Sequence, residues 1–172
     1  MKTLLFAAAA LLAPLPALAQ TTPPPATAPV GAPLTIYGTE LAPGWQNWSW
    51  AKTELSVELP GSARRPILVE AQSYQALYLH TTTFSTAPYR SFTFLVQSVG
   101  GEGQLFVKAI VAGKEVPGKV RVVRLAPGGW TRVEVALADL GAANTNIEGF
   151  WIQNGTGEAS PRFYVTEIML KP

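Results

Sequence analysis

The chain has 172 residues, of which 48% are hydrophobic and only 14% are charged, and its formal net charge is +2. This length corresponds to one domain, and the composition excludes disorder as the general state of the chain. The near-neutral charge gives no basic stripe of the kind that nucleic-acid binding requires. With one histidine and no cysteine, the sequence also excludes disulfides and metal sites built from His and Cys.

The first 19 residues have the three parts of an export signal. Lys2 supplies a positive charge, residues 4–12 form an apolar run, and Ala-Leu-Ala at residues 17–19 matches a signal-peptidase site before Gln20. The apolar run is too short to span a bilayer. We therefore predict a signal peptide at residues 1–19 and a secreted or periplasmic protein.

Residues 20–33 (QTTPPPATAPVGAP) are rich in proline and threonine. Such a segment has little to bury and favours an extended, polyproline-like conformation. We predict a linker at residues 20–33, followed by one folded domain at residues 34–172. No second apolar run reaches membrane-spanning length, so no membrane span is expected.

Short segments with apolar or alternating side chains follow one another from residue 34 onward, and turn signals rich in glycine and proline separate them. They predict about ten strands, at residues 34–37, 53–59, 66–71, 76–82, 89–98, 105–112, 116–125, 130–135, 147–153 and 162–170. Turns are expected at residues 100–103 and 113–115, and one helical turn at residues 136–141. This pattern indicates an all-β fold, an antiparallel β-sandwich or barrel.

Residues 44–50 (GWQNWSW) hold three of the five tryptophans. In an extended chain Gln46, Trp48 and Trp50 point to one face, while Trp45 follows a Pro-Gly turn signal. Tryptophan combines a large apolar ring with one N–H donor. The cluster is therefore either an anchor in the core or a stacking surface for a flat ligand.

The second half of the chain contains, in order, GGWTRVEV (128–135), ALADL (136–140), IEGFWIQN (147–154) and FYVTEIML (163–170). This order resembles the closing half of the galactose-binding-like jelly rolls that occur as carbohydrate-binding modules of secreted glycoside hydrolases. The resemblance covers residues 34–172. It implies a single β-sandwich of jelly-roll type and a secreted protein that binds a glycan.

The resemblance also bears on metal binding. Many such modules carry two consecutive acids after Tyr-Val in the last strand, and these often help to hold a structural calcium. Here the step is Thr166-Glu167, and Glu40, after the first predicted strand, supplies one further carboxylate. Calcium takes about six to eight oxygens. Two carboxylates fall short of that number, so we expect no metal. If a structural calcium is bound, Glu40 and Glu167 are the candidate ligands.

The sides of the strands that face away from the apolar side collect polar and aromatic residues. Aromatic rings stack on the C–H faces of sugars, and a few amides and hydroxyls fix the orientation of a ligand. The residues on these sides are Tyr78, His80, Thr93, Gln97, Trp151 and Gln153. The candidate ligand-binding residues are Trp48, Trp50, Tyr78, His80, Trp151 and Gln153. Alternatively, Tyr78 and His80 are ordinary exposed sheet residues and Trp151 lies under a loop.

The sequence favours a non-catalytic protein. It has no G-x-S-x-G nucleophile motif, and its eleven acids lie mostly on strand faces or in turns. One alternative is a small hydrolase, namely a glycosidase that uses two carboxylates about 5 to 10 Å apart. We predict a secreted carbohydrate-binding protein. The other alternative is a structural or adhesive envelope protein that binds another protein through its sandwich.

Overall fold

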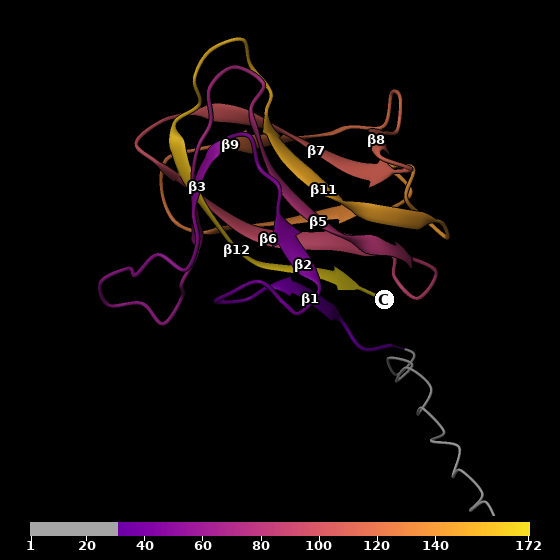
Figure 1. Ribbon diagram of the computed structural model, residues 1–172. Coiled ribbons are helices and arrows are strands. Elements are labelled where there is room, and N and C mark those ends of the chain that lie inside the picture. Colours follow the sequence, from indigo (N-terminus) through magenta and orange to yellow (C-terminus); the bar gives the residue numbers. More distant parts are fainter. Residues whose placement is uncertain (1–30) are drawn as a thin grey trace, which may run out of the picture.

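The computed structural model describes residues 31–172 (Figure 1). The signal peptide predicted at residues 1–19 and residues 20–30 of the predicted linker lie outside the described residues. The described part consists of strands, turns and loops, without an α-helix. None of its segments is a helix that is long and apolar enough to cross a membrane.

Residues 31–172 contain twelve strands. They are β1 (Leu34–Tyr37), β2 (Trp45–Asn47), β3 (Lys52–Glu54), β4 (Ile67–Glu70), β5 (Ala76–Ser85), β6 (Ser91–Val99), β7 (Gly103–Val111), β8 (Lys114–Glu115), β9 (Arg121–Leu125), β10 (Thr131–Ala136), β11 (Asn146–Asn154) and β12 (Arg162–Lys171).

The strands form two six-stranded sheets. Sheet A has the order β10-β6-β12-β4-β3, with β1 paired to β12, and sheet B has the order β2-β5-β11-β7-β8, with β9 paired to β7. Every pairing between these strands is antiparallel. The predicted all-β antiparallel sandwich is therefore confirmed.

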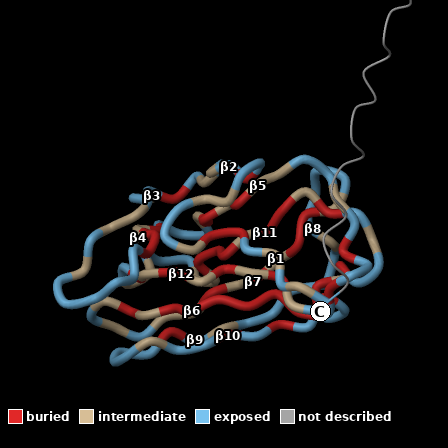
Figure 2. The backbone as a smooth tube through the Cα atoms, turned by 90° about the horizontal axis from the view of Figure 1, so that it is seen from below, coloured by how far each residue is buried: buried red, intermediate tan, exposed pale blue. Residues whose placement is uncertain are grey.

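The core lies between the two sheets, where the alternation of the sequence places the apolar side chains. Leu77 and Leu79 of β5 are buried from the side of sheet B, and Phe92 of β6 is buried from the side of sheet A. The rings of Phe92 and Phe150 stack with centroids 4.0 Å apart, which joins β6 to β11 across the sandwich. Figure 2 shows the buried stretches along the strands and the exposed ones mainly in the loops.

The strand predicted at residues 53–59 is wrong beyond Glu54, where β3 ends. Ser56 adopts φ 58°, a left-handed conformation that leaves the extended path of a strand. Its backbone N–H donates to the hydroxyl of Tyr37 (2.9 Å), and that hydroxyl donates to the carbonyl of Arg65 (2.8 Å). The chain therefore enters a long loop that projects from the sandwich before β4 (Figure 1).

The segment from residue 113 to residue 125 also differs from the prediction. The predicted turn at residues 113–115 contains the short strand β8, which pairs with the end of β7. Of the strand predicted at residues 116–125, only residues 121–125 are extended, as β9. The interruption has a local cause: the N–H of Lys119 donates to the carbonyl of Val116, and Gly118 has φ 69°. Residues 137–141 form the consecutive turns that the sequence predicted there, and the N–H groups of Asp139, Leu140 and Gly141 each donate to the carbonyl three residues earlier.

Candidate functional site

The outer face of sheet B gathers the polar and aromatic residues of four neighbouring strands. Tyr78 of β5 lies opposite Trp151 of β11, and Trp151 lies opposite Lys108 of β7. Gln46 of β2 lies opposite His80 of β5. Paired residues point to the same side of a sheet, so these five side chains share the face that is turned away from the core.

Trp48 lies over this face, immediately after β2. Its ring stacks on the imidazole of His80, with centroids 3.6 Å apart and an angle of 7° between the planes. It meets Tyr78 edge-on at 6.1 Å, and its indole N–H donates to the side-chain oxygen of Gln46 (2.8 Å). The ring is nevertheless 54% exposed. Trp48 is thus held from below while much of its surface faces solvent.

Trp50 is held in a similar way to Trp48: it contacts a ring of the sheet and donates its indole N–H within the protein. Its ring meets Trp151 edge-to-face, with centroids 4.9 Å apart and an angle of 83°. Its indole N–H donates to the backbone carbonyl of Tyr74 (3.2 Å), and 41% of the residue is exposed. The first tryptophan of the cluster, Trp45, is buried and packs edge-on against Phe84. The segment therefore contains one core anchor and two exposed rings.

Tyr74, in the loop before β5, is a third exposed ring that the sequence analysis missed. It is 54% exposed and adopts φ 55°, which is unusual for a bulky side chain. Its carbonyl accepts hydrogen bonds from Nε2 of Gln153 (2.7 Å) and from Nε1 of Trp50. A loop residue has no strand alternation, so no periodic signal identifies it. We call Trp48, Trp50 and Tyr74 the aromatic platform.

Tyr78, His80 and Trp151 lie beneath or beside the platform and form a support layer of partly buried rings. Nδ1 of His80 and Nε1 of Trp151 are buried and make no hydrogen bond within the described part of the chain. Burial, and secondarily the negative charge of Glu148, raises the pKa of Tyr78 above its usual value of 10.0. Gln153, only 9% exposed, uses its amide to hold Tyr74.

Lys108 is a second neighbour that the sequence analysis did not select. Its ammonium lies 5.8 Å from the ring centroid of Trp151 and 5.9 Å from that of Phe106, within the range of cation–π contacts. It also forms an ion pair with Glu115 of β8. A positive charge therefore borders the support layer directly.

Thr93 and Gln97 do not join this surface, because β6 belongs to sheet A. Thr93 is fully buried, and its hydroxyl faces the carbonyl of Met169 at 3.5 Å. Gln97 donates to the carbonyl of Gly128 (2.9 Å). A surface shared with Tyr78 and Trp151 would require these strands to lie in one sheet, and for Thr93 and Gln97 this condition is not met.

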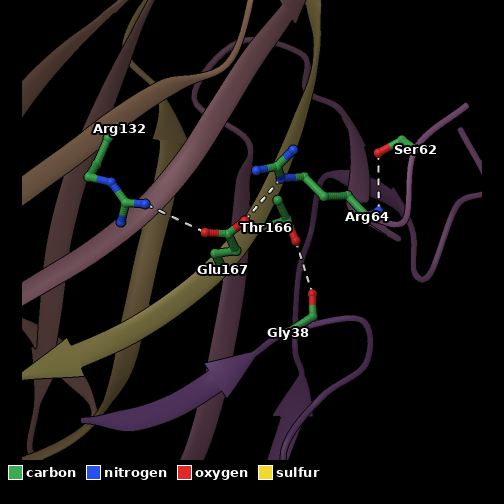
Figure 3. A network of polar contacts seen from close by, with 6 residues as sticks. All are labelled: Gly38, Ser62, Arg64, Arg132, Thr166 and Glu167. Carbon is green, nitrogen blue, oxygen red and sulfur yellow. Dashed lines mark hydrogen bonds and ion pairs between the residues drawn. The ribbon is translucent and has the colours of Figure 1, made fainter.

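The two calcium candidates lie at the other sheet. Glu167 occupies an irregular position of β12 with φ 50°, and its carboxylate contacts Arg64 (2.9 Å) and Arg132 (3.6 Å), as Figure 3 shows. Glu40 lies in the exposed loop after β1. Among residues 31–172 no three His, Cys, Asp or Glu side chains gather as a metal site would require. Calcium binding by Glu40 and Glu167 stays a prediction.

Known proteins resemble this chain mainly in fold. No protein-family model matches the sequence. An endoglucanase of Dictyostelium discoideum is 23% identical over 148 residues, which is 81% of this chain but only 21% of that enzyme. The chain thus spans about a fifth of the length of this curated relative.

Several solved carbohydrate-binding modules share the architecture. The family 11 module of Clostridium thermocellum, in complex with a β-1,3-1,4-mixed-linked tetrasaccharide, aligns with a TM-score of 0.61 at 16% identity, over 83% of this chain and 96% of its own. A family 29 module of Piromyces equi aligns with a TM-score of 0.55 at 16% identity, over 81% and 89%. The domain therefore has the fold of the jelly-roll carbohydrate-binding modules, as its sequence pattern predicts.

Proposed function

We propose that the protein is an exported, non-catalytic module that binds a polysaccharide on the outer face of sheet B. The observation that carries this proposal is the aromatic platform: Trp48, Trp50 and Tyr74 expose their rings in one region of the surface. The fold supports it, because the solved neighbours include modules in complex with mannohexaose and with a mixed-linked tetrasaccharide.

The geometry of the platform suits sugar rings. Both indole N–H groups are engaged within the protein, by Gln46 and by the Tyr74 carbonyl, so the tryptophans present ring surface rather than donors to a ligand. Pyranoses offer apolar C–H faces that match such surfaces, and aromatic residues supply large contact areas at low entropic cost. The support layer fixes the rings before the ligand arrives, which reduces the ordering cost of binding.

The proposal is tested by calorimetric titration of the purified protein with a panel of soluble plant and microbial polysaccharides. We expect saturable binding of at least one glycan, and a loss of about tenfold or more in affinity for Trp48→Ala and for Trp50→Ala, as for hot-spot aromatics. Trp130→Ala is the matched control, because Trp130 packs against Tyr164 on sheet A.

Failure of every glycan to bind a folded sample would overturn the proposal, and so would equal losses for the Trp48, Trp50 and Trp130 variants. Export is checked separately, by cell fractionation with and without residues 1–19. A hydrolase would require product formation that is abolished by changing a single glutamate.

A protein ligand is the second candidate, and the same observation favours it. Exposed Trp and Tyr side chains that lie together are typical of protein–protein hot spots, and Trp48, Trp50 and Tyr74 form such a group. A partner protein that co-purifies with the wild type, is lost with Trp50→Ala, and is not displaced by any soluble glycan would replace the carbohydrate proposal with this one.

A further inference from the structure

The near-neutral net charge of the chain conceals a strong asymmetry. Residues 103–125, which contain β7, β8 and β9, hold five basic side chains and one acidic one, whereas the other described residues hold seven basic and ten acidic ones. The basic residues of this segment are Lys108, Lys114, Lys119, Arg121 and Arg124, and the acidic one is Glu115. The segment thus has a net charge of +4 and the other described residues a net charge of −3, and Lys2, outside the described residues, completes the +2 of the whole chain.

This charge lies next to the aromatic residues of sheet B. β9 pairs with β7, and β7 pairs with β11, which carries Trp151 (Figure 1). Two strand spacings, about 10 Å, therefore separate β9 from β11. Arg124 lies opposite Gln104, and Val122 lies opposite Phe106, so both point to the outer face of the sheet.

Four of the five cations in this segment form no ion pair with a described residue, whereas Lys108 pairs with Glu115. Within residues 31–172, Lys114, Lys119, Arg121 and Arg124 form no ion pair, and all four are exposed. We call these four residues the basic edge. On sheet A, by contrast, Arg64 and Arg132 both contact Glu167. The charges of the basic edge are therefore available to a ligand.

We propose that the ligand of this face is an acidic polysaccharide, whose sugar rings stack on the aromatic platform while its carboxylate or sulfate groups contact the basic edge. This inference rests on the proposed function and specifies the class of glycan. Guanidinium groups bind carboxylate and sulfate oxygens with two parallel hydrogen bonds, which makes Arg124, on the outer face, the expected anion contact. Arg121 lies opposite the buried Val107, so it adds its positive charge from the other side of β9. Val120 follows Lys119 in the sequence, and Val122 lies between Arg121 and Arg124. These two valines are 40% and 44% exposed, so they add apolar surface beside the charged side chains.

The test compares pairs of glycans that differ only in charge. Polygalacturonate is set against highly methyl-esterified pectin, and a sulfated galactan against its desulfated form, so that the two arms separate carboxylate from sulfate. Calorimetric titrations are run with the whole protein at low and at high salt. The variant is Arg121→Gln/Arg124→Gln, and the control is Arg90→Gln/Arg162→Gln, which removes the same charge from exposed arginines outside sheet B.

We expect at least one acidic glycan to bind at least about fivefold more tightly than its uncharged counterpart, with a difference that shrinks at high salt. The basic-edge variant abolishes the difference and the control variant keeps it. Equal binding of both members of each pair would overturn the acidic ligand but leave the proposed function intact. Absence of binding to any glycan would overturn both, and equally tight binding of a DNA duplex would show a general response to anions instead.

Discussion

At the scale of single residues, the backbone carbonyl of Tyr74 organises the candidate surface. It accepts hydrogen bonds from Gln153 of β11 and from Trp50, so it links the sheet to two of the three exposed rings. Tyr74 itself adopts a left-handed conformation, which costs a non-glycine residue on the order of 1 kcal/mol or more. A strained backbone conformation persists only where neighbouring groups stabilise it. For Tyr74, the stabilising contact is the hydrogen bond from the Gln153 amide to its carbonyl.

The hydrogen bond from Gln153 to the Tyr74 carbonyl leads us to expect that Gln153 positions Tyr74, whereas its predicted role as a ligand contact stays a prediction. A double-mutant cycle distinguishes the two roles. Tyr74→Asn removes the ring but tolerates φ 55°, so the carbonyl keeps its place. We expect Tyr74→Asn and Gln153→Ala each to weaken glycan binding by about 1–2 kcal/mol, and the double variant to lose less than the sum of the two single losses, because both changes act through the Tyr74 loop.

The measurement is calorimetric affinity for the glycan that the wild type binds, with thermal unfolding to confirm that each variant folds. Gln153→Ala is expected to lower stability by only about 1 kcal/mol, since it removes one hydrogen bond to a backbone carbonyl. Additive losses of affinity would assign Gln153 a direct contact with the sugar, as the sequence pattern suggested.

At the scale of elements, the sequence predicted which side chains share a face of one strand but not which strands are neighbours. The alternation in residues 76–82 and 147–153 set Tyr78, His80, Trp151 and Gln153 on the sides opposite the core, because side chains alternate with a period of two. The same alternation holds for Thr93, yet β6 pairs in sheet A. Pairing depends on contacts between distant segments, which no local pattern contains.

Gly149 marks an irregularity that the alternation rule does not predict. The register of β11 against β5 shifts between Ile147 and Gly149, where Gly149 has φ 147°. A Cβ added there would lie 2.1 Å from the carbonyl oxygen of Leu79 and 3.0 Å from Cε2 of Tyr78. The glycine therefore lets β11 approach β5 directly below the support layer.

We expect Gly149→Ala to destabilise the domain by about 2 kcal/mol or more, because backbone atoms of β5 would have to move. The measurement is the free energy of unfolding in denaturant, with affinity for the glycan as a second readout that should fall as well. Gly157→Ala is the control, since a Cβ at Gly157 meets no atom within 4 Å. An unchanged unfolding free energy for Gly149→Ala would contradict the close approach.

At the scale of the whole molecule, the apolar core between the two sheets is the main source of stability, in a sequence without cysteine. Polar contacts across sheet A add connections between distant segments. The carboxylate of Glu167 lies between Arg64 and Arg132, and the neighbouring Thr166 donates to the carbonyl of Gly38 (2.9 Å) (Figure 3). These contacts tie the projecting loop and the end of β1 to β12. The resemblance that suggested calcium at this position could not anticipate the two arginines, because they come from distant segments of the chain.

We therefore expect the melting temperature to change by less than about 1 °C when EDTA or millimolar calcium is added. Glu167 already has two cationic partners, and a calcium ion beside them would be repelled by both guanidinium groups. Differential scanning calorimetry provides the measurement, with Glu167→Gln as the comparison. A rise of several degrees with calcium that disappears in Glu167→Gln would assign a structural metal to this position. Because Glu167 lies on the sheet opposite the aromatic platform, the same additions should leave glycan affinity unchanged.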